Sequence, residues 1–194
     1  METYPYQVES LAAIRHLEAQ VLEFDGIALR YASFYGPGTS LSASGEITEL
    51  VRKRRLPIIG NGTGVWSFLH VDDAATATIA AIEHGTSGVY NIADDHPAPV
   101  SEWLPELAQV LGVKSPPRIP VWLGRLAAGE VGVSMMTSIR GISNAKARRE
   151  FGWAPRYASY REGFRNGFGG TSASRIATLS APDQPRGGRG RIRL

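Results

Sequence analysis

The sequence predicts an α/β fold built on parallel strands, and two adjacent patterns support this. Apolar residues recur every three or four positions from Leu11 to Phe24, as in an amphipathic helix, and Asp25-Gly26 ends that helix. The mostly apolar run Ile27–Tyr31 follows at once. A short apolar run bounded by glycine is typical of a strand buried in a parallel sheet, so a helix leads directly into a buried strand.

The elements that follow alternate in the same way. Tyr35-Gly36-Pro37-Gly38 breaks the chain after the first strand. Asp72 and Ser101 are each expected to cap a helix, and Gly152 to end one. Helices are expected over residues 46–54, 73–83, 101–111, 121–128 and 146–151, and the capping box Ser159-Tyr160-Arg161-Glu162 opens a last helix. Strands are expected over residues 57–59, 66–70 and 88–92.

Length and composition suit one globular domain with a substantial core. The chain has 194 residues, 43% of them hydrophobic, with 22 Gly and 12 Pro that favour many turns. It has no cysteine, so disulfides and thiolate metal sites are excluded and nothing indicates export. No apolar run approaches the roughly 18 residues that span a bilayer, and the first residues lack a signal-peptide pattern. We therefore expect a cytoplasmic protein without a membrane segment.

The formal net charge of +3 comes from the end of the chain. Residues 169–194 hold five Arg and one Asp, or +4, which leaves 16 basic and 17 acidic residues in 1–168, or −1. Gly, Ser, Arg and Pro dominate this tail, so it is expected to be disordered. The run Arg186-Gly187-Gly188-Arg189-Gly190-Arg191 resembles segments that bind RNA loosely. No aromatic residue interleaves its arginines, so nucleic-acid binding is the weaker interpretation.

Motifs for phosphate, metal and nucleophile chemistry are weak. Gly60-x-Gly62-x-Gly64 precedes a strand rather than a helix, which favours a turn over a phosphate cradle. Alternation along a strand places His70 and Asp72 on one face and leaves Asp73 for the first turn of a helix, so no metal site is predicted. Asp94-Asp95-His96 is interpreted as a solvated turn, although α/β proteins bind ligands at the carboxyl ends of strands. No serine lies in a Gly-x-Ser-x-Gly elbow.

Four short stretches, taken in order, share the residues and spacing of one known family. They are Leu29-Arg30-Tyr31-x-x-Phe34-Tyr35-Gly36-Pro37-Gly38; Leu56-Pro57-Ile58-Ile59-Gly60-Asn61-Gly62 with Phe68-Leu69-His70-Val71-Asp72-Asp73-Ala74; Gly88-Val89-Tyr90-Asn91-Ile92; and Lys146-Ala147-Arg148-x-x-Phe151-Gly152-Trp153-x-Pro155. Together they resemble the NAD-dependent epimerase/dehydratase family, the extended short-chain dehydrogenases that act mainly on nucleotide sugars.

The resemblance implies the C-terminal part of a Rossmann-type doubly wound parallel sheet with a small α/β substrate domain. Residues 1–35 are then the last catalytic helix and strand of the NAD(P)-binding domain. Residues 36–168 are the substrate-binding region, with some elements returning to the sheet, and residues 169–194 are the tail. The family's glycine-rich fingerprint, acidic ribose-binding residue and catalytic Ser or Thr are implied to lie in a preceding half that this chain lacks.

The resemblance also implies a catalytic and cofactor side. The family's Tyr-x-x-x-Lys pair precedes the long helix, and here Tyr6 is the candidate general acid/base, with Ser10 in place of the lysine. A lysine one helical turn away lowers the pKa of the phenol and holds the ribose hydroxyls. Because that lysine is absent, packing at the helix edge is the alternative role of Tyr6. Tyr31, Ala32 and Ser33 are implied to face the nicotinamide and the reacting carbon.

The substrate side is implied by the same comparison. Ser33 would lie beside the substrate, and Leu56, Pro57 and Ile59 would line the pocket near its distal end. Family members that bind nucleotide diphosphates carry an Arg where this chain has Trp66, and guanidinium geometry suits a diphosphate. An apolar or stacking contact is expected at Trp66 instead. Core or loop packing is the alternative role of all these residues.

The expected function is that of an NAD(P)-dependent epimerase, dehydratase or oxidoreductase acting on a sugar-like or other hydroxyl-bearing small molecule. NAD or NADP is the implied cofactor, and this chain alone is expected to be inactive without a phosphate cradle. One alternative is a partner-dependent substrate-binding subunit that completes its sheet with a separate chain, or a degenerate fragment. A second alternative is nucleic-acid association through the Arg-rich tail. Helix pairing through residues 8–24 makes a homodimer the expectation by family analogy.

Overall fold

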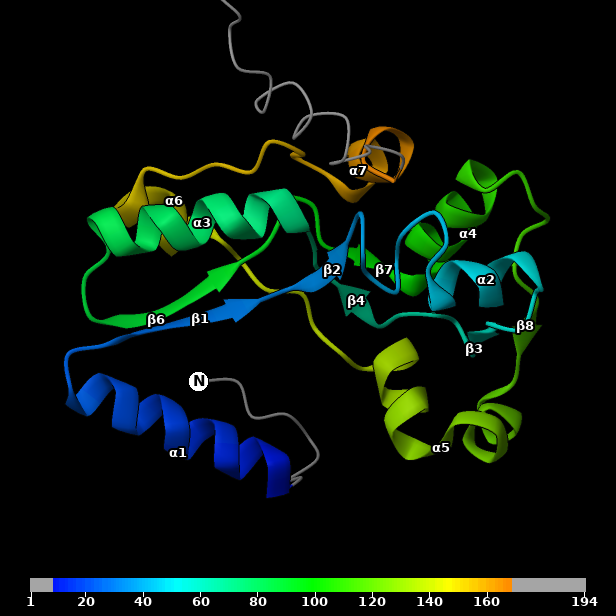
Figure 1. The fold of residues 1–194 in the computed structure, drawn as a ribbon. Coiled ribbons are helices and arrows are strands. Elements are labelled where there is room, and N and C mark those ends of the chain that lie inside the picture. Colours follow the sequence, from blue (N-terminus) through cyan, green and yellow to red (C-terminus); the bar gives the residue numbers. More distant parts are fainter. Residues whose placement is uncertain (1–8, 169–194) are drawn as a thin grey trace, which may run out of the picture.

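A computed structural model describes residues 9–168 and shows short, mostly parallel strands enclosed by helices (Figure 1). In chain order the elements are α1 (Glu9–Glu23), β1 (Ile27–Tyr31), β2 (Ser33–Tyr35), α2 (Glu46–Arg52), β3 (Ile58–Ile59), β4 (Val65–Trp66), β5 (Phe68–His70), α3 (Val71–His84), β6 (Gly88–Ile92), β7 (Ala98–Pro99), α4 (Val100–Val110), β8 (Arg118–Ile119), α5 (Val121–Thr137), α6 (Ala145–Phe151) and α7 (Tyr160–Asn166). The tail and Tyr6 lie outside the described residues, so the predictions made for them stay predictions.

The strands form four pairs. β1 pairs parallel with β6, from Ile27 opposite Gly88 to Tyr31 opposite Ile92. β2 with β5 and β3 with β8 are also parallel, whereas β4 with β7 is antiparallel. α1 lies on one side of the β1–β6 pair, and α3 and α6 lie on the other (Figure 1). Helices on both faces of parallel strands confirm the predicted α/β class.

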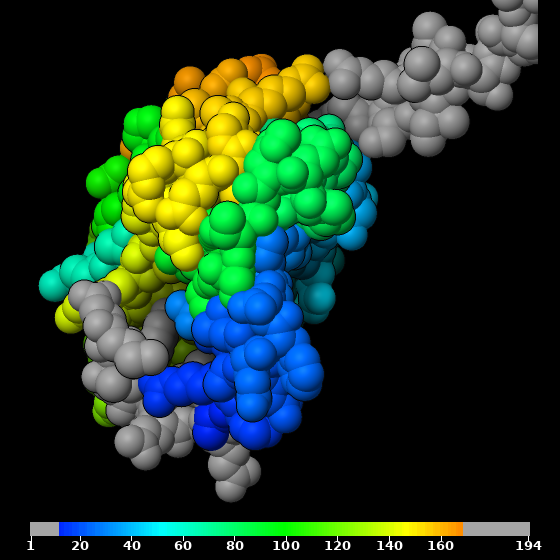
Figure 2. All heavy atoms as spheres, turned by 90° about the vertical axis from the view of Figure 1, so that its left-hand side faces the viewer, coloured from blue at the N-terminus to red at the C-terminus, as the bar shows by residue number. Residues whose placement is uncertain are grey.

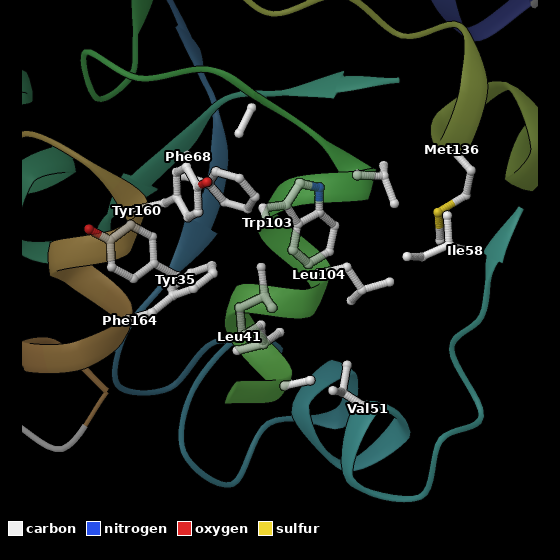
Figure 3. Packing of buried hydrophobic residues seen from close by; sticks show 14 of the residues in the cluster. Tyr35, Leu41, Val51, Ile58, Phe68, Trp103, Leu104, Met136, Tyr160 and Phe164 are labelled. Atoms are coloured by element: carbon white, nitrogen blue, oxygen red, sulfur yellow. The ribbon is translucent and has the colours of Figure 1, made fainter. Parts of the chain in front are cut away.

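Two hydrophobic cores hold these layers together. The smaller core fills the space between the β1–β6 pair and the helices α3 and α6, and the tilted rings of Tyr90 and Phe151 lie 4.3 Å apart there. The larger core surrounds Trp103 of α4, with Phe68, Tyr160 and Phe164 on one side and Ile58 and Met136 on the other (Figure 3). Aromatic side chains bury the most area per residue, so this cluster fixes how β5, α4 and α7 pack.

Two predicted helix caps are wrong. His70, and not Asp72, caps α3, because its Nδ1 atom accepts a hydrogen bond of 3.1 Å from the backbone N–H of Asp72. Asp72 lies inside the helix and therefore does not share a strand face with His70. α4 follows Pro99 without a side-chain cap, and Ser101 lies in its first turn. Both helices begin earlier than predicted, which moves the capping position off the predicted residue.

The other predicted helix boundaries are confirmed where their signal is local. Ser159 caps α7 by accepting a hydrogen bond of 3.4 Å from the N–H of Glu162. Gly152 ends α6 in the left-handed conformation, at φ 65° and ψ 14°. The helix predicted over 121–128 ends at Gly129, whose backbone at φ 66° and ψ −177° is not helical, and a second helical segment of α5 follows this kink to Thr137.

The strand predicted over 66–70 is divided into two. It breaks at Ser67, so that β4 pairs with β7 and β5 pairs with β2. The hydroxyl of Ser67 accepts a hydrogen bond of 3.0 Å from the N–H of Ile142 and fixes the break. The alternation of residues along the segment cannot show this break, because each half of the segment belongs to a different strand pair.

Candidate functional site

Two parallel strands end side by side at the predicted cofactor contacts. Tyr31 is the last residue of β1 and lies opposite Ile92 of β6. The N–H of Ala32 donates to the carbonyl of Ile92 at 2.9 Å, and the N–H of Ser33 donates to the carbonyl of Ser67 at 3.0 Å. The chain thus changes partner strand within three residues. Because open α/β sheets bind ligands at the carboxyl ends of their strands, this edge is the candidate site.

The side chain of Tyr31 turns towards the helix that covers the sheet. Its hydroxyl is 2.5 Å from Oγ1 of Thr78 in α3, and its ring lies 5.5 Å from the ring of Phe34. Tyr31 and Phe34 are both exposed. These two rings, tilted by 40° to each other, give this strand end an exposed apolar surface. The contact of Thr78 with Tyr31 has no sequence signal, because it depends on how α3 packs on β1.

Trp66 of β4 directly precedes Ser67, whose carbonyl accepts the hydrogen bond from Ser33, and three contacts hold its indole ring. Its indole N–H donates a hydrogen bond of 2.8 Å to the carbonyl of Met135 in α5. Its ring is 5.2 Å from the ring of Trp103 and stacks on that of Phe68 at 6.3 Å. The half-buried indole therefore forms part of an apolar wall that runs from β4 to α5.

The three residues predicted for the distal end of the substrate do not lie with Tyr31–Ser33. Leu56 and Pro57 are half-buried before β3, which lies at the opposite end of the molecule from β1 (Figure 1). Ile59 is 2% exposed and belongs to the larger core, where α5 packs on β3. α5 connects this group to Trp66. Any contact of Leu56, Pro57 or Ile59 with a substrate stays a prediction.

Asp94 contradicts the expectation of a solvated turn after β6. Its side chain is 2% exposed, and its backbone N–H donates to the carbonyl of Phe68 at 2.7 Å. One carboxylate oxygen accepts a hydrogen bond of 3.1 Å from the N–H of His96, and the other has no partner within the described part of the chain. Burial raises the pKa of Asp94 to about 7. The only sequence signal for this group was its position at a strand end.

The next residue shows why the turn is rigid. Asp95 accepts a hydrogen bond of 2.8 Å from the side-chain amide of Asn144, which also donates to the carbonyl of Ala93 at 2.8 Å. Arg148 of α6 adds an ion pair to the same carboxylate at 2.5 Å. These contacts hold the carboxyl end of β6 against α6. Asp94 is thereby fixed beside the candidate site instead of moving in solvent.

Phosphate and metal chemistry find no support in residues 9–168. Gly60-x-Gly62-x-Gly64 forms the predicted turn, with a hydrogen bond of 3.1 Å from the N–H of Gly62 to the carbonyl of Ile59. The first amides of α4 donate back to the carbonyls of this turn, Val100 to Gly64 and Ser101 to Gly62. Those amides are therefore not available to a phosphate. No cluster of three acidic or histidine side chains in this region could hold a metal ion.

Comparison with known proteins then decides the family, because residues 2–93 match the model of the NAD dependent epimerase/dehydratase family. The chain belongs to this family. Within the family, 3-diazoavenalumate denitrifying reductase of a Streptomyces species is 38% identical to it over 161 residues, 82% of this chain and 53% of that protein. 2-alkyl-3-oxoalkanoate reductase of Stenotrophomonas maltophilia is 26% identical over 190 residues, 83% of this chain and 56% of that protein. The epimerase/dehydratase chain thus spans about half the length of these curated relatives.

Solved structures agree with the family's fold. A human epimerase family protein with NADPH has a TM-score of 0.61 and 18% identity, over 74% of this chain and 48% of that one. dTDP-glucose 4,6-dehydratase of Bacillus anthracis with NAD has a TM-score of 0.59 and 21% identity, over 87% and 52%. At these identities the likeness shows the Rossmann-type fold alone. The family implies a nicotinamide cofactor for this epimerase/dehydratase chain.

No helix within residues 9–168 is both long and apolar enough to cross a membrane.

Proposed function

We propose that this chain forms the substrate side of an NAD(P)-dependent reductase in the cytoplasm, acting on an apolar or aromatic small molecule with a carbonyl or hydroxyl group. The main support for this proposal is the set of contacts around Trp66. Its ring stacks on Phe68, and its N–H is bound to Met135. A diphosphate calls for a guanidinium or other cation at such a place, whereas an indole face suits a flat or apolar group. A nucleotide sugar is therefore the less suitable substrate.

The residues at the end of β1 would hold the cofactor and the substrate in position for the reaction. NAD(P), when bound, supplies the hydride that passes to or from the substrate carbon. Tyr31 and Ala32 would lie against the nicotinamide ring, and Ser33 would offer its hydroxyl to the substrate oxygen. The proposed contacts are limited to that end of the cofactor, because the first amides of α4 bind the carbonyls of the 60–64 turn and are not available for its phosphates. Trp66 would orient the apolar part of the substrate.

The names of two relatives support a reductase. One is a 3-diazoavenalumate denitrifying reductase and the other a 2-alkyl-3-oxoalkanoate reductase. The second name denotes a ketone with an alkyl substituent, which needs an apolar wall and no diphosphate site. Trp66 and α5 offer such a wall.

The test is ligand binding by the chain without cofactor, measured by calorimetry. The ligands are a short 2-alkyl-3-oxoalkanoate and UDP-glucose. We expect heat of binding from the first only, and its loss in Trp66→Arg. Trp122→Arg is the matched control, because Trp122 is exposed on α5 and has no part in this wall. Circular dichroism checks that both variants fold. Binding of UDP-glucose in place of the oxoalkanoate would refute the proposal.

A further inference from the structure

The first segment of α5, up to its kink, turns an apolar face away from the protein. It packs on β3 through Gly124, where an added Cβ would lie 2.6 Å from Cγ2 of Ile59. By helical spacing, Trp122 and Leu126 lie one turn apart on the side opposite Gly124, and they are 62% and 79% exposed. Large apolar residues of a helix normally face a core, so these indicate an interaction surface. We call the exposed large apolar residues of α5 the α5 face: Trp122, Leu123, Leu126 and Val131.

Basic side chains gather at the same end of the molecule. α5 follows β8 and packs on β3, away from β1 (Figure 1). The segments around these elements, residues 53–59 and 111–131, hold six basic residues against one acidic residue. Residues 9–168 as a whole hold 16 of each, so this end is positive while the rest of the described chain is negative. The six basic residues are all exposed, and they are Lys53, Arg54, Arg55, Lys114, Arg118 and Arg125.

Most of these cations are available to an outside charge. Lys53 pairs with Glu49 of α2 at 3.6 Å, and Arg125 pairs with Glu130. Exposed pairs of this kind are weak, so they are easily exchanged for another anion. The other four form no ion pair within the part of the chain that the structure describes: Arg54, Arg55, Lys114 and Arg118.

We propose that the α5 face and the basic residues around it dock this protein on an anionic lipid surface. Helices that lie in a membrane interface combine exposed Trp and Leu with flanking Lys and Arg, as this end does. Trp122 and Leu126 would enter the boundary between headgroups and acyl chains, and the cations would meet the anionic headgroups. α5 has 17 residues broken by its kink, whereas crossing a bilayer takes about 20 continuous ones, so it would lie along the surface. The inference goes beyond the proposed function and does not depend on it.

A second copy of the chain and a nucleic acid fit this surface less well. Pairing two α5 faces about a two-fold axis would set two positive ends against each other, and like charges in an interface cost free energy. A nucleic acid would suit the charge, but it binds by stacking bases on aromatic rings. Three of the four residues of the α5 face are aliphatic, and aliphatic side chains suit acyl chains instead.

The test is co-sedimentation of the full chain with lipid vesicles. One set is phosphatidylcholine alone, and the other contains about 30% phosphatidylserine. We expect binding to the second set, weakened about tenfold or more when the salt concentration rises from about 0.05 to 0.5 M, because salt screens exposed charges. No binding, or equal binding to both sets, would overturn the proposal.

A pair of apolar variants locates the contact. Leu126→Asp changes an exposed residue, so the chain should fold, and vesicle binding should weaken about tenfold or more. Ile82→Asp is the matched control, because Ile82 is also 79% exposed, and it should leave binding unchanged. Ile82 belongs to α3, which lies on the face that Figure 2 shows (green), whereas α5 lies towards the opposite end of the molecule (Figure 1). Equal effects of both variants, or none from Leu126→Asp, would assign the binding to another part of the chain and overturn the proposal.

A pair of charge variants tests the basic border. Arg54→Gln combined with Arg55→Gln should weaken binding to the phosphatidylserine vesicles severalfold and reduce its dependence on salt. Arg15→Gln combined with Arg149→Gln is the control, since it removes the same net charge from exposed positions of α1 and α6. Equal weakening by both double variants would show an effect of net charge alone and overturn the proposal. A dimer of the chain that Leu126→Asp breaks, without vesicle binding, would assign the α5 face to a second copy and likewise overturn it.

Discussion

Buried polar side chains hold the segment that leads into α7 against the strands. Asp73 accepts hydrogen bonds from the backbone N–H groups of Arg156 and Tyr157, at 2.8 and 3.2 Å. Nδ1 of His70 is an acceptor in its cap, so Nε2 carries the proton and donates to the carbonyl of Gly167 at 3.5 Å. These side chains come from the start of α3. Single residues there therefore decide whether the last helix stays closed over the larger core.

Asp94 gives the stability a pH dependence. The pKa of an aspartate is about 3.9 in an unfolded chain, and burial raises that of Asp94 to about 7 in the folded state. The folded protein therefore binds more protons between these values, and the free energy of unfolding falls as the pH rises through this window. We expect Asp94→Asn to remove this contribution, up to a few kcal/mol, leaving only a pH-independent cost of the buried amide. Urea unfolding of both proteins from pH 4 to pH 8 measures this difference in the free energy of unfolding. If that free energy changed with pH in the same way in both proteins, the prediction would be contradicted.

Asp73 should be worth more to stability than its neighbour in sequence. Asp73→Ala leaves two backbone N–H groups without their acceptor in a side-chain site that is 3% exposed. The expected loss is about 2–4 kcal/mol of unfolding free energy. Asp72→Ala is the control, because that side chain is 58% exposed, and it should cost less than about 1 kcal/mol. Urea unfolding followed by tryptophan fluorescence compares the free energies of unfolding of the two variants. Equal losses would show that the two hydrogen bonds of Asp73 do not stabilise the fold.

At the residue scale, the sequence shows which side chains are polar, but it did not predict which of them are buried. Asp94-Asp95-His96 has the composition of a surface turn, and Asp94 is buried only because β5 and α7 close over it. The same limit applies to Trp66. An apolar or stacking contact was predicted for its ring, but its hydrogen bond to the carbonyl of Met135 could not be predicted. Burial of a polar side chain depends on contacts between distant segments, which local composition does not record.

At the scale of elements, prediction succeeded where the signal lies inside the element. The helix ending at Gly152 and the β1–β6 strands have local stop signals and apolar patterns of sufficient length. β3, β4, β7 and β8 have two residues each, so their existence depends on the partner strand rather than on a pattern of their own. The caps of α3 and α4 moved for a similar reason, since the last residue of β5 and of β7 directly precedes each helix.

The kink in α5 supports a prediction on glycine. Gly129 has φ 66° and ψ −177°, a region that is essentially restricted to glycine, and an added Cβ would meet no atom within 4 Å. Gly129→Asn should therefore cost about 1–3 kcal/mol through backbone strain alone. Gly152→Asn is the matched control, because its left-handed conformation at ψ 14° is one that asparagine tolerates. Thermal unfolding of the two variants tests this, and an equal shift for both would mean that the kink straightens without cost.

At the scale of the molecule, four ordered motifs were enough to predict the α/β fold and the family. They were not enough to predict that Tyr31–Ser33 and Trp66 lie together while Leu56, Pro57 and Ile59 lie at the far end of α5. The motifs mark strand ends and turns, whereas these positions depend on contacts between distant segments, such as α5 on β3 and Trp66 on Met135. Family membership therefore predicts the fold better than it predicts where Trp66, Leu56, Pro57 and Ile59 lie.

The final prediction concerns the cofactor and the chain by itself. Tight binding of a dinucleotide needs free amides at the start of a helix for its pyrophosphate. The glycine-rich turn 60–64 binds the first amides of α4 with its own carbonyls. The contacts proposed for Tyr31–Ser33 with the nicotinamide end would be too few for tight binding. We expect calorimetry of the purified chain with NADH or NADPH to show no binding in the micromolar range. A micromolar dissociation constant would mean that a phosphate cradle forms from residues other than these.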